Sequence, residues 1–256
     1  MAGPNKSLGQ HWLKDRLILE AIADCIEISE SDTILEIGPG LGTLTSVLLD
    51  RAEKVVAVEF DAELARKLPG QFPGKELTVH NADILSFDLR QLPTGYKVVA
   101  NVPYYITSKI VSTLSNATNP PREVALLVQK EVAERIAAGP GEMSILSVAT
   151  QVYWDTELGP IVGKEWFTPP PKVDSRVIVL KRRAKPLVPD ADQKAFFRVV
   201  KAGFSERRKQ LRSALSGGLG ISKTDVDLLL EKAKLSPEAR AQELTVSDWM
   251  RLAQYI

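Results

Sequence analysis

Apolar and polar positions follow two alternating periods along the first 180 residues. Short runs of Val, Ile, Leu and Ala without charges are typical of strands buried on both faces of a sheet. Between them, apolar residues spaced three and four apart predict amphipathic helices. The expected strands are Thr33–Ile37, Val55–Glu59, Leu77–His80, Val98–Asn101, Val124–Val128, Ser147–Trp154 and Val177–Lys181. The expected helices are Arg16–Ile28, Leu44–Arg51, Ala62–Leu68, Ser108–Leu114 and Lys130–Ala138.

This alternation predicts an α/β fold with a mostly parallel sheet of seven strands and crossover helices. The last two expected strands have no good helix between them, which favours an antiparallel final pair. The segment Lys185–Pro189 contains two prolines and predicts a linker. We therefore expect one domain over residues 1–184 and a small all-α domain over 185–256. Its expected helices are Gln193–Gly203, Ser205–Leu215, Lys223–Lys232 and Ser247–Tyr255.

Composition narrows the class of protein. Hydrophobic residues make up 44% of the 256 and charged residues 25%, which is ordinary for a folded globular chain. Residues Met1–Lys6 lack the apolar run of a signal peptide, and no stretch approaches the ~20 apolar residues of a membrane span. One cysteine, Cys25, and two histidines, His11 and His80, make no zinc pattern. We expect a cytoplasmic monomer without bound metal.

Charge is divided unevenly along the chain. Residues 181–256 carry 16 Lys and Arg against nine Asp and Glu, a net charge of +7, whereas residues 1–180 carry −6. The excess is concentrated in 181–212, with 11 basic and three acidic residues. Such asymmetry favours a polyanionic partner, although a solvated helical face would have the same composition. The candidate RNA-binding residues are Arg207, Arg208, Lys209 and Arg212, of which Arg208 and Arg212 would share one face of an expected helix.

A glycine-rich loop follows the first expected strand and precedes a helix. Gly38, Gly40 and Gly42 let the backbone approach a bound nucleotide closely. Glu59 ends the second expected strand, 21 residues after Gly38, where a carboxylate can accept hydrogen bonds from ribose hydroxyls. Thr43 stands where a dinucleotide-binding loop has glycine or alanine, so S-adenosylmethionine fits better than NAD.

Asp83 follows the third expected strand. Its carboxylate could accept a hydrogen bond from an adenine amine. The alternative is that Asp83 is only a turn or helix-capping residue. Both interpretations stay open on the sequence.

The segment Asn101-Val102-Pro103-Tyr104 carries the candidate chemistry. The exocyclic amine of a nucleobase is a poor nucleophile because its lone pair is delocalised into the ring. The Asn101 side-chain oxygen and a backbone carbonyl, expected to be that of Val102, would accept its N–H bonds and stabilise the charge that develops on nitrogen. Tyr104 would stack on the base. After a strand, the same four residues can also form a simple turn.

An aromatic residue precedes three successive prolines later in the chain. Pro169–Pro171 stiffen the loop after Phe167 and would fix its ring. A rigid ring suits the stacking of a flipped base. A buried core phenylalanine beside a rigid turn fits the sequence as well.

Together these segments resemble the ribosomal RNA adenine dimethyltransferases along nearly the whole chain, and most of all the members that act on two adjacent adenines of small-subunit rRNA. The resemblance implies a class I, Rossmann-like S-adenosylmethionine-dependent methyltransferase domain followed by an RNA-binding helical domain. The matching segments are Ser7–Leu13, Glu36–Gly42, Glu59, Asn81–Asp83, Asn101–Ser108, Phe167–Ser175 and Phe204–Arg212.

The resemblance also implies roles for single residues. Contacts with S-adenosylmethionine would fall on His11, Leu13, Gly38, Glu59, Asp83 and Asn101, and Phe167 would stack on the target adenine opposite Tyr104. Three positions depart from the family pattern: His11 replaces the usual Asn, Trp12 the usual Phe, and Val102 the usual Leu or Ile. Of the three departures, only the one at position 11 puts a role in question, namely the contact of His11 with S-adenosylmethionine.

We therefore expect N6-dimethylation of two adjacent adenines in small-subunit rRNA, with the immature small ribosomal subunit as partner. The alternatives are a large-subunit rRNA adenine methylase of the antibiotic-resistance type, or a non-catalytic RNA-binding assembly factor. A DNA adenine methylase is less favoured because no large extra domain is available to recognise a DNA sequence. An NAD-dependent dehydrogenase is also less favoured, because no residue of the sequence stands out as an acid or base for hydride transfer.

Overall fold

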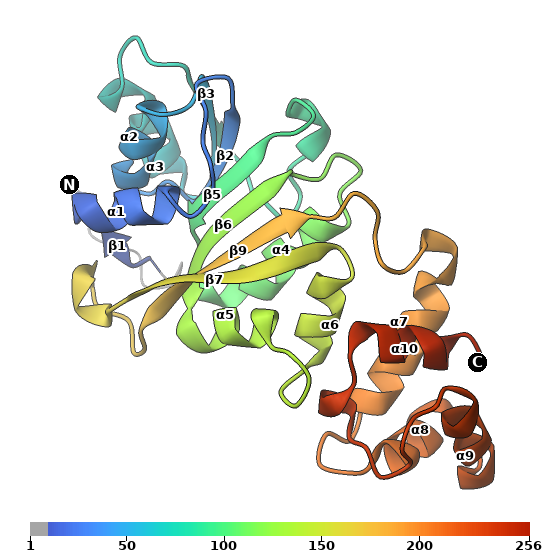
Figure 1. Ribbon diagram of the computed structural model, residues 1–256. Helices are drawn as coiled ribbons and strands as arrows, with labels where there is room; N and C mark the ends of the chain where they lie inside the picture. Colours follow the sequence, from blue (N-terminus) through green and yellow to red (C-terminus); the bar gives the residue numbers. More distant parts are fainter. Residues whose placement is uncertain (1–9) are drawn as a thin grey trace. The chain divides into compact units, whose positions relative to one another are not determined.

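A seven-stranded sheet forms the centre of the first unit of the chain (Figure 1). The computed structural model describes residues 10–256, so the expectations for Met1–Lys6 and Ser7–Gly9 lie outside the described residues. The strand order is β4-β3-β2-β5-β6-β9-β7. The strands are β2 (Thr33–Ile37), β3 (Lys54–Glu59), β4 (Leu77–Asn81), β5 (Lys97–Asn101), β6 (Glu123–Gln129), β7 (Trp154–Val162) and β9 (Ser175–Arg182).

The pairing of the strands follows the predicted pattern. The strands β4, β3, β2, β5 and β6 are parallel to their neighbours, and β9 is antiparallel to β6, with Val179 opposite Ala125. The mostly parallel, seven-stranded α/β fold is therefore confirmed. A separate two-stranded pair joins β1 (Trp12–Leu13) to β8 (Phe167–Thr168), with Leu13 opposite Phe167.

Helices cover the sheet because its central strands are apolar on both faces. Ile34, Val99 and Leu127 are almost fully buried with residues of α1 and α2 in one core cluster. In Figure 1, α1 and α2 lie on one side of the sheet and α4 on the other. The helices of this part are α1 (Arg16–Ala23), α2 (Thr43–Leu49), α3 (Ala62–Lys67), α4 (Thr107–Ser115) and α5 (Lys130–Ala137).

The strand expected at Ser147–Trp154 is wrong. Ile145–Gln151 forms helix α6, and the strand β7 begins only at Trp154. The helix begins with a capping box, in which Ser144 Oγ accepts from Ser147 N at 3.2 Å and Ser147 Oγ accepts from Ser144 N at 2.6 Å. Such a box satisfies two backbone N–H groups at the first turn. Local capping therefore outweighs the strand preference of Val148, Thr150 and Val152.

The second unit is helical. Among the described residues, 135–154 and 183–256 group together as one compact unit, and 10–134 and 155–182 as the other. The expected boundary at 184/185 is close to the division at 182/183, whereas 135–154, which we placed in the first domain, belongs to the second unit. Gln242 O accepts from Gly141 N at 2.8 Å and from Met143 N at 3.2 Å, and so ties this segment to the C-terminal residues.

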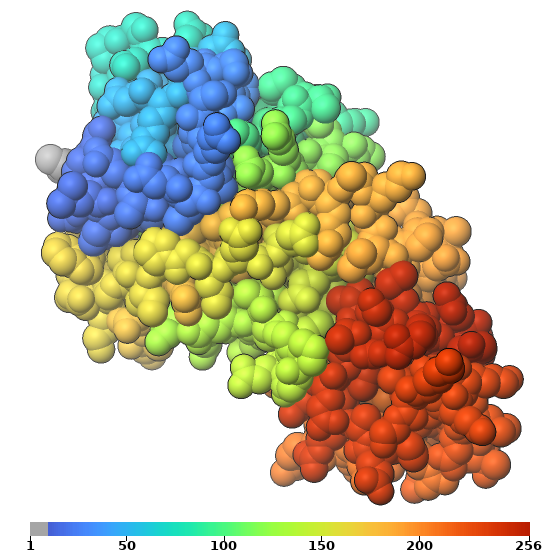
Figure 2. All heavy atoms as spheres, viewed as in Figure 1, coloured from blue at the N-terminus to red at the C-terminus, as the bar shows by residue number. Residues whose placement is uncertain are grey.

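The helices of the second unit pack around Trp249, which is fully buried. An added Cβ at Gly203 would lie 2.3 Å from the Trp249 ring, so α7 can approach that ring only with glycine at this position. Figure 2 shows the last helices, in orange and red, as closely packed atoms. The helices are α7 (Asp190–Phe204), α8 (Leu211–Leu219), α9 (Lys223–Lys232) and α10 (Val246–Ala253).

The basic helix expected at Ser205–Leu215 is also wrong in its bounds. Residues 205–209 form turns, and α8 begins at Leu211 after Gln210 as its N-cap residue. Arg208 and Arg212 therefore do not share a helical face as i and i+4 neighbours. Arg212 instead forms a two-pronged ion pair with Asp227, with both N–O distances at 2.5 Å.

Residues 10–256 contain neither a candidate membrane-spanning helix nor a candidate metal site. None of the helices there combines the length and apolar character that crossing a bilayer requires. In the same residues, no group of three or more His, Cys, Asp or Glu side chains is arranged to hold a metal ion.

Candidate active site

A cavity of about 330 Å³ opens at the carboxyl ends of the central parallel strands. The residues directly after β2, β3, β4 and β5 all line it, namely Gly38, Phe60, Ala82 and Val102. In open α/β sheets, ligands bind at this edge, where the loops after neighbouring strands meet. Seven predicted cofactor residues line this cavity, which are His11, Leu13, Gly38, Gly40, Glu59, Asp83 and Asn101.

Gly42 is the predicted cofactor residue that does not line the cavity. It is the N-cap residue of α2 and has φ = 80°, a conformation that favours glycine. An added Cβ there would lie 2.6 Å from Leu68 Cδ1. Gly42 is thus required for the turn and for packing, and the structure gives it no face toward a ligand.

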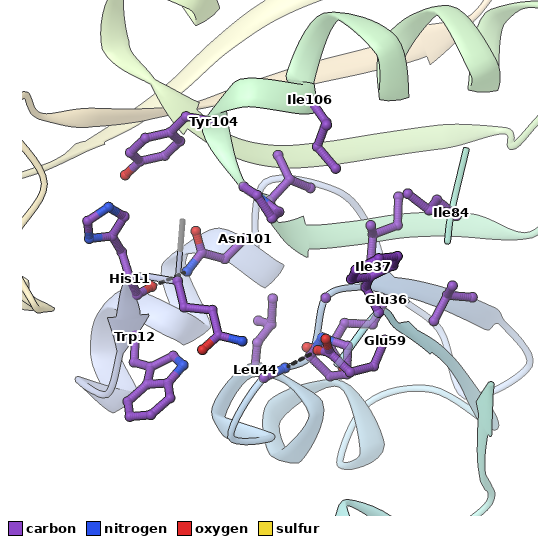
Figure 3. A pocket seen from close by; sticks show the side chains of 18 of the residues that line it. His11, Trp12, Glu36, Ile37, Leu44, Glu59, Ile84, Asn101, Tyr104 and Ile106 are labelled. Carbon is purple, nitrogen blue, oxygen red and sulfur yellow. Dashed lines mark hydrogen bonds between the residues drawn. The ribbon is translucent and has the colours of Figure 1, made fainter. Parts of the chain in front are cut away.

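Glu59 is fixed by backbone donors on both sides. Its Oε2 accepts from Gly40 N at 3.0 Å (Figure 3), and its Oε1 accepts from Asp61 N at 2.8 Å. Burial raises the pKa of the Glu59 carboxyl, and these N–H bonds oppose the rise. Each carboxylate oxygen has a further lone pair, so the group can still accept hydrogen bonds from ligand hydroxyls.

A second carboxyl, Glu36, lies in β2 behind the glycine loop. It is 1% exposed, and its Oε2 accepts from Thr45 Oγ1 at 2.6 Å. Burial raises the pKa of Glu36 from 4.5 to about 8, and the nearby Glu59 carboxylate adds to the rise. Glu36 is therefore mainly uncharged at neutral pH, and both carboxyl groups line the cavity.

This pKa gives a prediction for stability. The folded protein keeps a proton on Glu36 that the unfolded chain releases above pH 4.5, so this stability is complete below pH 4.5 and is lost as the pH rises toward about 8. Glu36→Gln cannot ionise. Between about pH 5 and about pH 8, its free energy of unfolding should rise relative to wild type, by on the order of a few kcal/mol.

Urea unfolding at both pH values measures this difference. Glu53→Gln is the matched control, because Glu53 is exposed and the substitution removes the same charge. A Glu36→Gln difference that stays constant across this pH range would contradict a neutral Glu36 in the folded protein.

Asn101 ends β5 with its amide turned in a defined direction. Its Nδ2 donates to His11 O at 3.3 Å. In Figure 3 the side-chain oxygen of Asn101 consequently points to the Tyr104 side of the cavity. The chain then turns at Pro103 into a short 3-10 helix over Tyr104–Ile106. The structure thus combines an oriented acceptor and an aromatic ring within four residues.

Tyr104 is held by contacts at both its hydroxyl and its ring. Its hydroxyl is 2.7 Å from Ser175 Oγ in β9. The His11 ring lies nearly parallel to the Tyr104 ring, with centroids 5.7 Å apart and an angle of 17° between the planes. His11 Nδ1 donates to Pro169 O at 2.7 Å, which fixes the orientation of the imidazole.

Phe167 does not occupy the predicted position opposite Tyr104. Its side chain is 3% exposed and packs in the core cluster with Leu13 and Leu19, outside the cavity lining. The pairing of β8 with β1 places Phe167 opposite Leu13 and turns it into the core. The ring that faces Tyr104 belongs to His11. Of the two interpretations of Phe167, the structure supports the buried core residue.

Asp83 agrees with both interpretations left open by the sequence. Its Oδ1 accepts from Leu85 N at 2.9 Å, the contact of a turn residue. It also lines the cavity, beside Ile84. The turn holds the carboxylate, and the second oxygen can accept a hydrogen bond from a ligand.

Some cavity residues carried no signal in the sequence that we used. Phe60 lines the cavity and is 59% exposed, and its position directly after Glu59 could have indicated it. Ser175 lies outside the cavity lining but hydrogen-bonds to the Tyr104 hydroxyl, and it lay within a matching segment without an assigned role. Lys109 and Glu36 also line the cavity. The bend of the chain after β5 brings Lys109 there, and the buried position of β2 brings Glu36 there.

Comparisons with known proteins show the family of the chain. The model of the family "Ribosomal RNA adenine dimethylase" matches residues 2–256. The chain is 38% identical over 251 residues to ribosomal RNA small subunit methyltransferase A of Dehalococcoides mccartyi strain CBDB1, covering 96% of this chain and 86% of that protein.

Solved structures give the same grouping. The dimethyladenosine transferase of Plasmodium falciparum superposes with a TM-score of 0.81 at 26% identity, covering 94% of this chain and 96% of that one. The 23S rRNA methyltransferase ErmE superposes with a TM-score of 0.78 at 30% identity, covering 95% and 98%. The match of the family over almost all residues, with the site at the expected edge of the sheet, places this chain in the ribosomal RNA adenine dimethylase family.

Proposed function

We propose that this protein uses S-adenosylmethionine to dimethylate the N6 amines of two adjacent adenines in small-subunit rRNA. One observation carries the proposal: the Asn101 side-chain oxygen faces the same cavity, and the same side of it, as the Tyr104 ring (Figure 3). An acceptor for amine hydrogens beside a stacking ring suits a planar base with an exocyclic amine.

The described residues fit S-adenosylmethionine as the methyl donor. When bound, it supplies an electrophilic methyl group on a sulfonium sulfur. Glu59 offers free lone pairs for ribose hydroxyls, and Asp83 and Phe60 line the cavity where an adenine would lie. The cavity of about 330 Å³ is within the size range of small-molecule sites. His11, Leu13 and Gly38 complete the lining.

Asn101 and Val102 would activate the amine. Asn101 Oδ1 and the Val102 carbonyl oxygen would each accept a hydrogen bond from one N–H of the amine. These two hydrogen bonds favour a pyramidal nitrogen with an available lone pair. The same oxygens stabilise the positive charge that develops as the N–C bond forms. The bond from Asn101 Nδ2 to His11 O holds the acceptor in place beforehand. No general base is required, because the methylated nitrogen becomes acidic and can lose its proton to water.

The target base would stack on Tyr104. The bond to Ser175 fixes the tilt of the phenol ring, and His11 lies parallel to it. The His11 ring stacks on Tyr104 with centroids 5.7 Å apart, so a base that stacks on Tyr104 from this side would displace the His11 ring.

The identity of the RNA is supported by the relatives. The similar curated protein of D. mccartyi is named for the small subunit, at 38% identity. Likeness to a 23S rRNA methyltransferase at 30% identity makes large-subunit rRNA the second candidate. Small and large subunits from cells without either modification can be offered separately with labelled donor. Label in small-subunit rRNA supports the proposal, label in large-subunit rRNA supports the second candidate, and no label supports a non-catalytic assembly factor.

The helical unit supplies cations for RNA phosphates. Lys209 pairs with Glu206 and Arg212 with Asp227, so each of these charges is partly balanced within the protein. No ion pair is recorded for Arg207 or Arg208 with any of residues 10–256. Arg207 and Arg208 are therefore the stronger RNA-binding candidates of the four predicted residues.

Reversal of Arg207 and Arg208 to Glu should weaken binding to small ribosomal subunits by about tenfold or more. Each lost phosphate contact should also lower the slope of log affinity against log salt by about 0.7–0.9. Binding measured over a salt series tests both effects. Lys232→Glu, at an exposed position in the same unit, is the control and should leave the slope nearly unchanged. Wild-type affinity and slope in the double variant would mean that these arginines only solvate the surface.

A further inference from the structure

Tyr105 presents an exposed aromatic ring at the rim of the cavity. The residue is 66% exposed, although it lines the same cavity as Tyr104. Within residues 10–256, no hydrogen bond or ring contact is recorded for its side chain. One exposed apolar residue is ordinary on a protein surface. At the rim of a site that takes a flipped base, however, such a ring is a surface on which a second base can stack.

The local backbone turns the two adjacent tyrosines in different directions. Tyr104–Ile106 form a 3-10 helix, which has three residues per turn, so successive side chains are about 120° apart. In Figure 3 the Tyr104 and Ile106 side chains accordingly point to different sides. Tyr104 is half-buried and its hydroxyl lies 2.7 Å from Ser175 Oγ, whereas Tyr105 extends into solvent. The two rings therefore cannot stack on one base, and each can take a base of its own.

Lys109 adds a positive charge to the same part of the rim. It follows Tyr105 by four residues, in the first turn of α4, and its side chain is exposed. Among the described residues that line the cavity, it is the only lysine or arginine. No ion pair is recorded for Lys109 with any of residues 10–256. Its ammonium is therefore available to an anion that approaches the mouth of the cavity.

The chemistry of the proposed substrate supplies both partners. An adenine that flips into the cavity leaves its neighbour in the strand without a stacking partner, which costs free energy. An exposed ring beside the cavity restores a partner to that neighbouring base, whatever its identity. The phosphate between the two nucleotides carries the negative charge that an unpaired lysine binds. Because the proposed targets are adjacent, the neighbour of one target adenine is the other.

We propose that Tyr105 and Lys109 form a subsite for the nucleotide next to the flipped adenine. The base of that nucleotide stacks on the Tyr105 ring, and the Lys109 ammonium binds the phosphate that joins the two nucleotides. The inference rests on the proposed function, since it needs an RNA base in the cavity. A strand has a direction, so the subsite takes the neighbour on one side of the flipped adenine only.

The test of Tyr105 removes the ring and the neighbouring base separately and together. Small subunits are reconstituted with rRNA in which one or the other of the two adjacent adenines is abasic, and methylation of the remaining adenine is followed. On intact subunits, Tyr105→Ala should lower kcat/KM for that adenine about tenfold. On one of the two abasic substrates it should lower kcat/KM by less than about twofold, because no base is left to stack.

Two variants control this experiment. Tyr105→Phe keeps the ring and should retain the wild-type kcat/KM on intact subunits. Tyr255→Ala removes another exposed ring, 45% exposed and outside the cavity lining, and should leave kcat/KM unchanged.

The salt dependence of binding tests Lys109. Lys109→Gln should lower the slope of log affinity for small subunits against log salt by about 0.7–0.9, the value for one phosphate contact, and Lys109→Arg should restore it. Lys232→Gln, at an exposed position outside the cavity lining, should leave the slope nearly unchanged. Calorimetry with S-adenosylmethionine should give the wild-type affinity for every variant of Tyr105 and Lys109, which also shows that these variants are folded.

The outcomes separate the subsite from the proposed function. Equal losses from Tyr105→Ala on intact and on both abasic substrates would overturn the stacking. A wild-type salt slope in Lys109→Gln would overturn the phosphate contact. Weaker binding of S-adenosylmethionine in Tyr105→Ala or Lys109→Gln would place that residue with the methyl donor and overturn its part in the subsite. If wild-type protein does not methylate intact small subunits, the proposed function itself fails, and the inference fails with it.

Discussion

Asn101→Ala is expected to lower the single-turnover rate of methyl transfer by about a hundredfold or more. The substitution removes the Asn101 side-chain oxygen that points to the Tyr104 side of the cavity, and with it an acceptor that is already oriented before the base arrives. Because this oxygen acts on the amine of the base, its loss should affect the reaction more than the binding of the methyl donor. Rapid-quench measurements with excess enzyme give the rate of the chemical step directly.

Glu59→Ala is the matched control for Asn101→Ala. It removes a carboxylate that two backbone N–H groups hold at the edge of the same cavity. We expect its affinity for S-adenosylmethionine to fall by about 1.5–3 kcal/mol, the value of a hydrogen bond to a charged group, whereas Asn101→Ala should lose less. The assignment of Asn101 to the amine fails if its variant transfers methyl groups at a rate close to that of wild type.

Tyr104→Ala is expected to lower kcat/KM for rRNA by about tenfold to a hundredfold, because stacking of a base on an aromatic ring is worth about 1–3 kcal/mol. Tyr104→Phe keeps the ring and loses only the hydroxyl bond to Ser175. It should therefore retain most of the activity, and Ser175→Ala should resemble it. Steady-state kinetics on small ribosomal subunits compare the three variants.

Two results would contradict a stacking role for Tyr104. Equal losses in Tyr104→Ala and Tyr104→Phe would move the effect from the ring to the hydroxyl. A parallel loss of S-adenosylmethionine affinity in Tyr104→Ala would mean that the ring holds the methyl donor instead of the base.

The sheet could be predicted from sequence because its central strands are apolar on both faces. Thr33–Ile37 was predicted with the bounds that the structure has, and Leu77–His80 is one residue short of β4. The prediction failed where a local contact decides the structure. At Ser147–Trp154 a serine capping box begins a helix in a β-branched segment, and at residues 205–210 the chain turns before α8 begins.

The candidate site was predictable as far as it depends on residues at strand ends. Glu59 and Asn101 end β3 and β5, and parallel strands bring their carboxyl ends to one edge. What the sequence could not give was the direction of side chains set by long-range pairing. The β1–β8 pair turns Phe167 into the core and brings His11 opposite Tyr104, and neither effect can be read from local spacing.

The most direct test of the account is to identify the product by mass spectrometry. Small ribosomal subunits from cells lacking the endogenous modification are incubated with the protein and S-adenosylmethionine, and the rRNA is then digested and sequenced by fragment mass. The account predicts N6,N6-dimethyladenosine at two adjacent positions, formed by wild type and not by Asn101→Ala. Methyl groups on another atom or another base, or unmodified small-subunit rRNA, would contradict it.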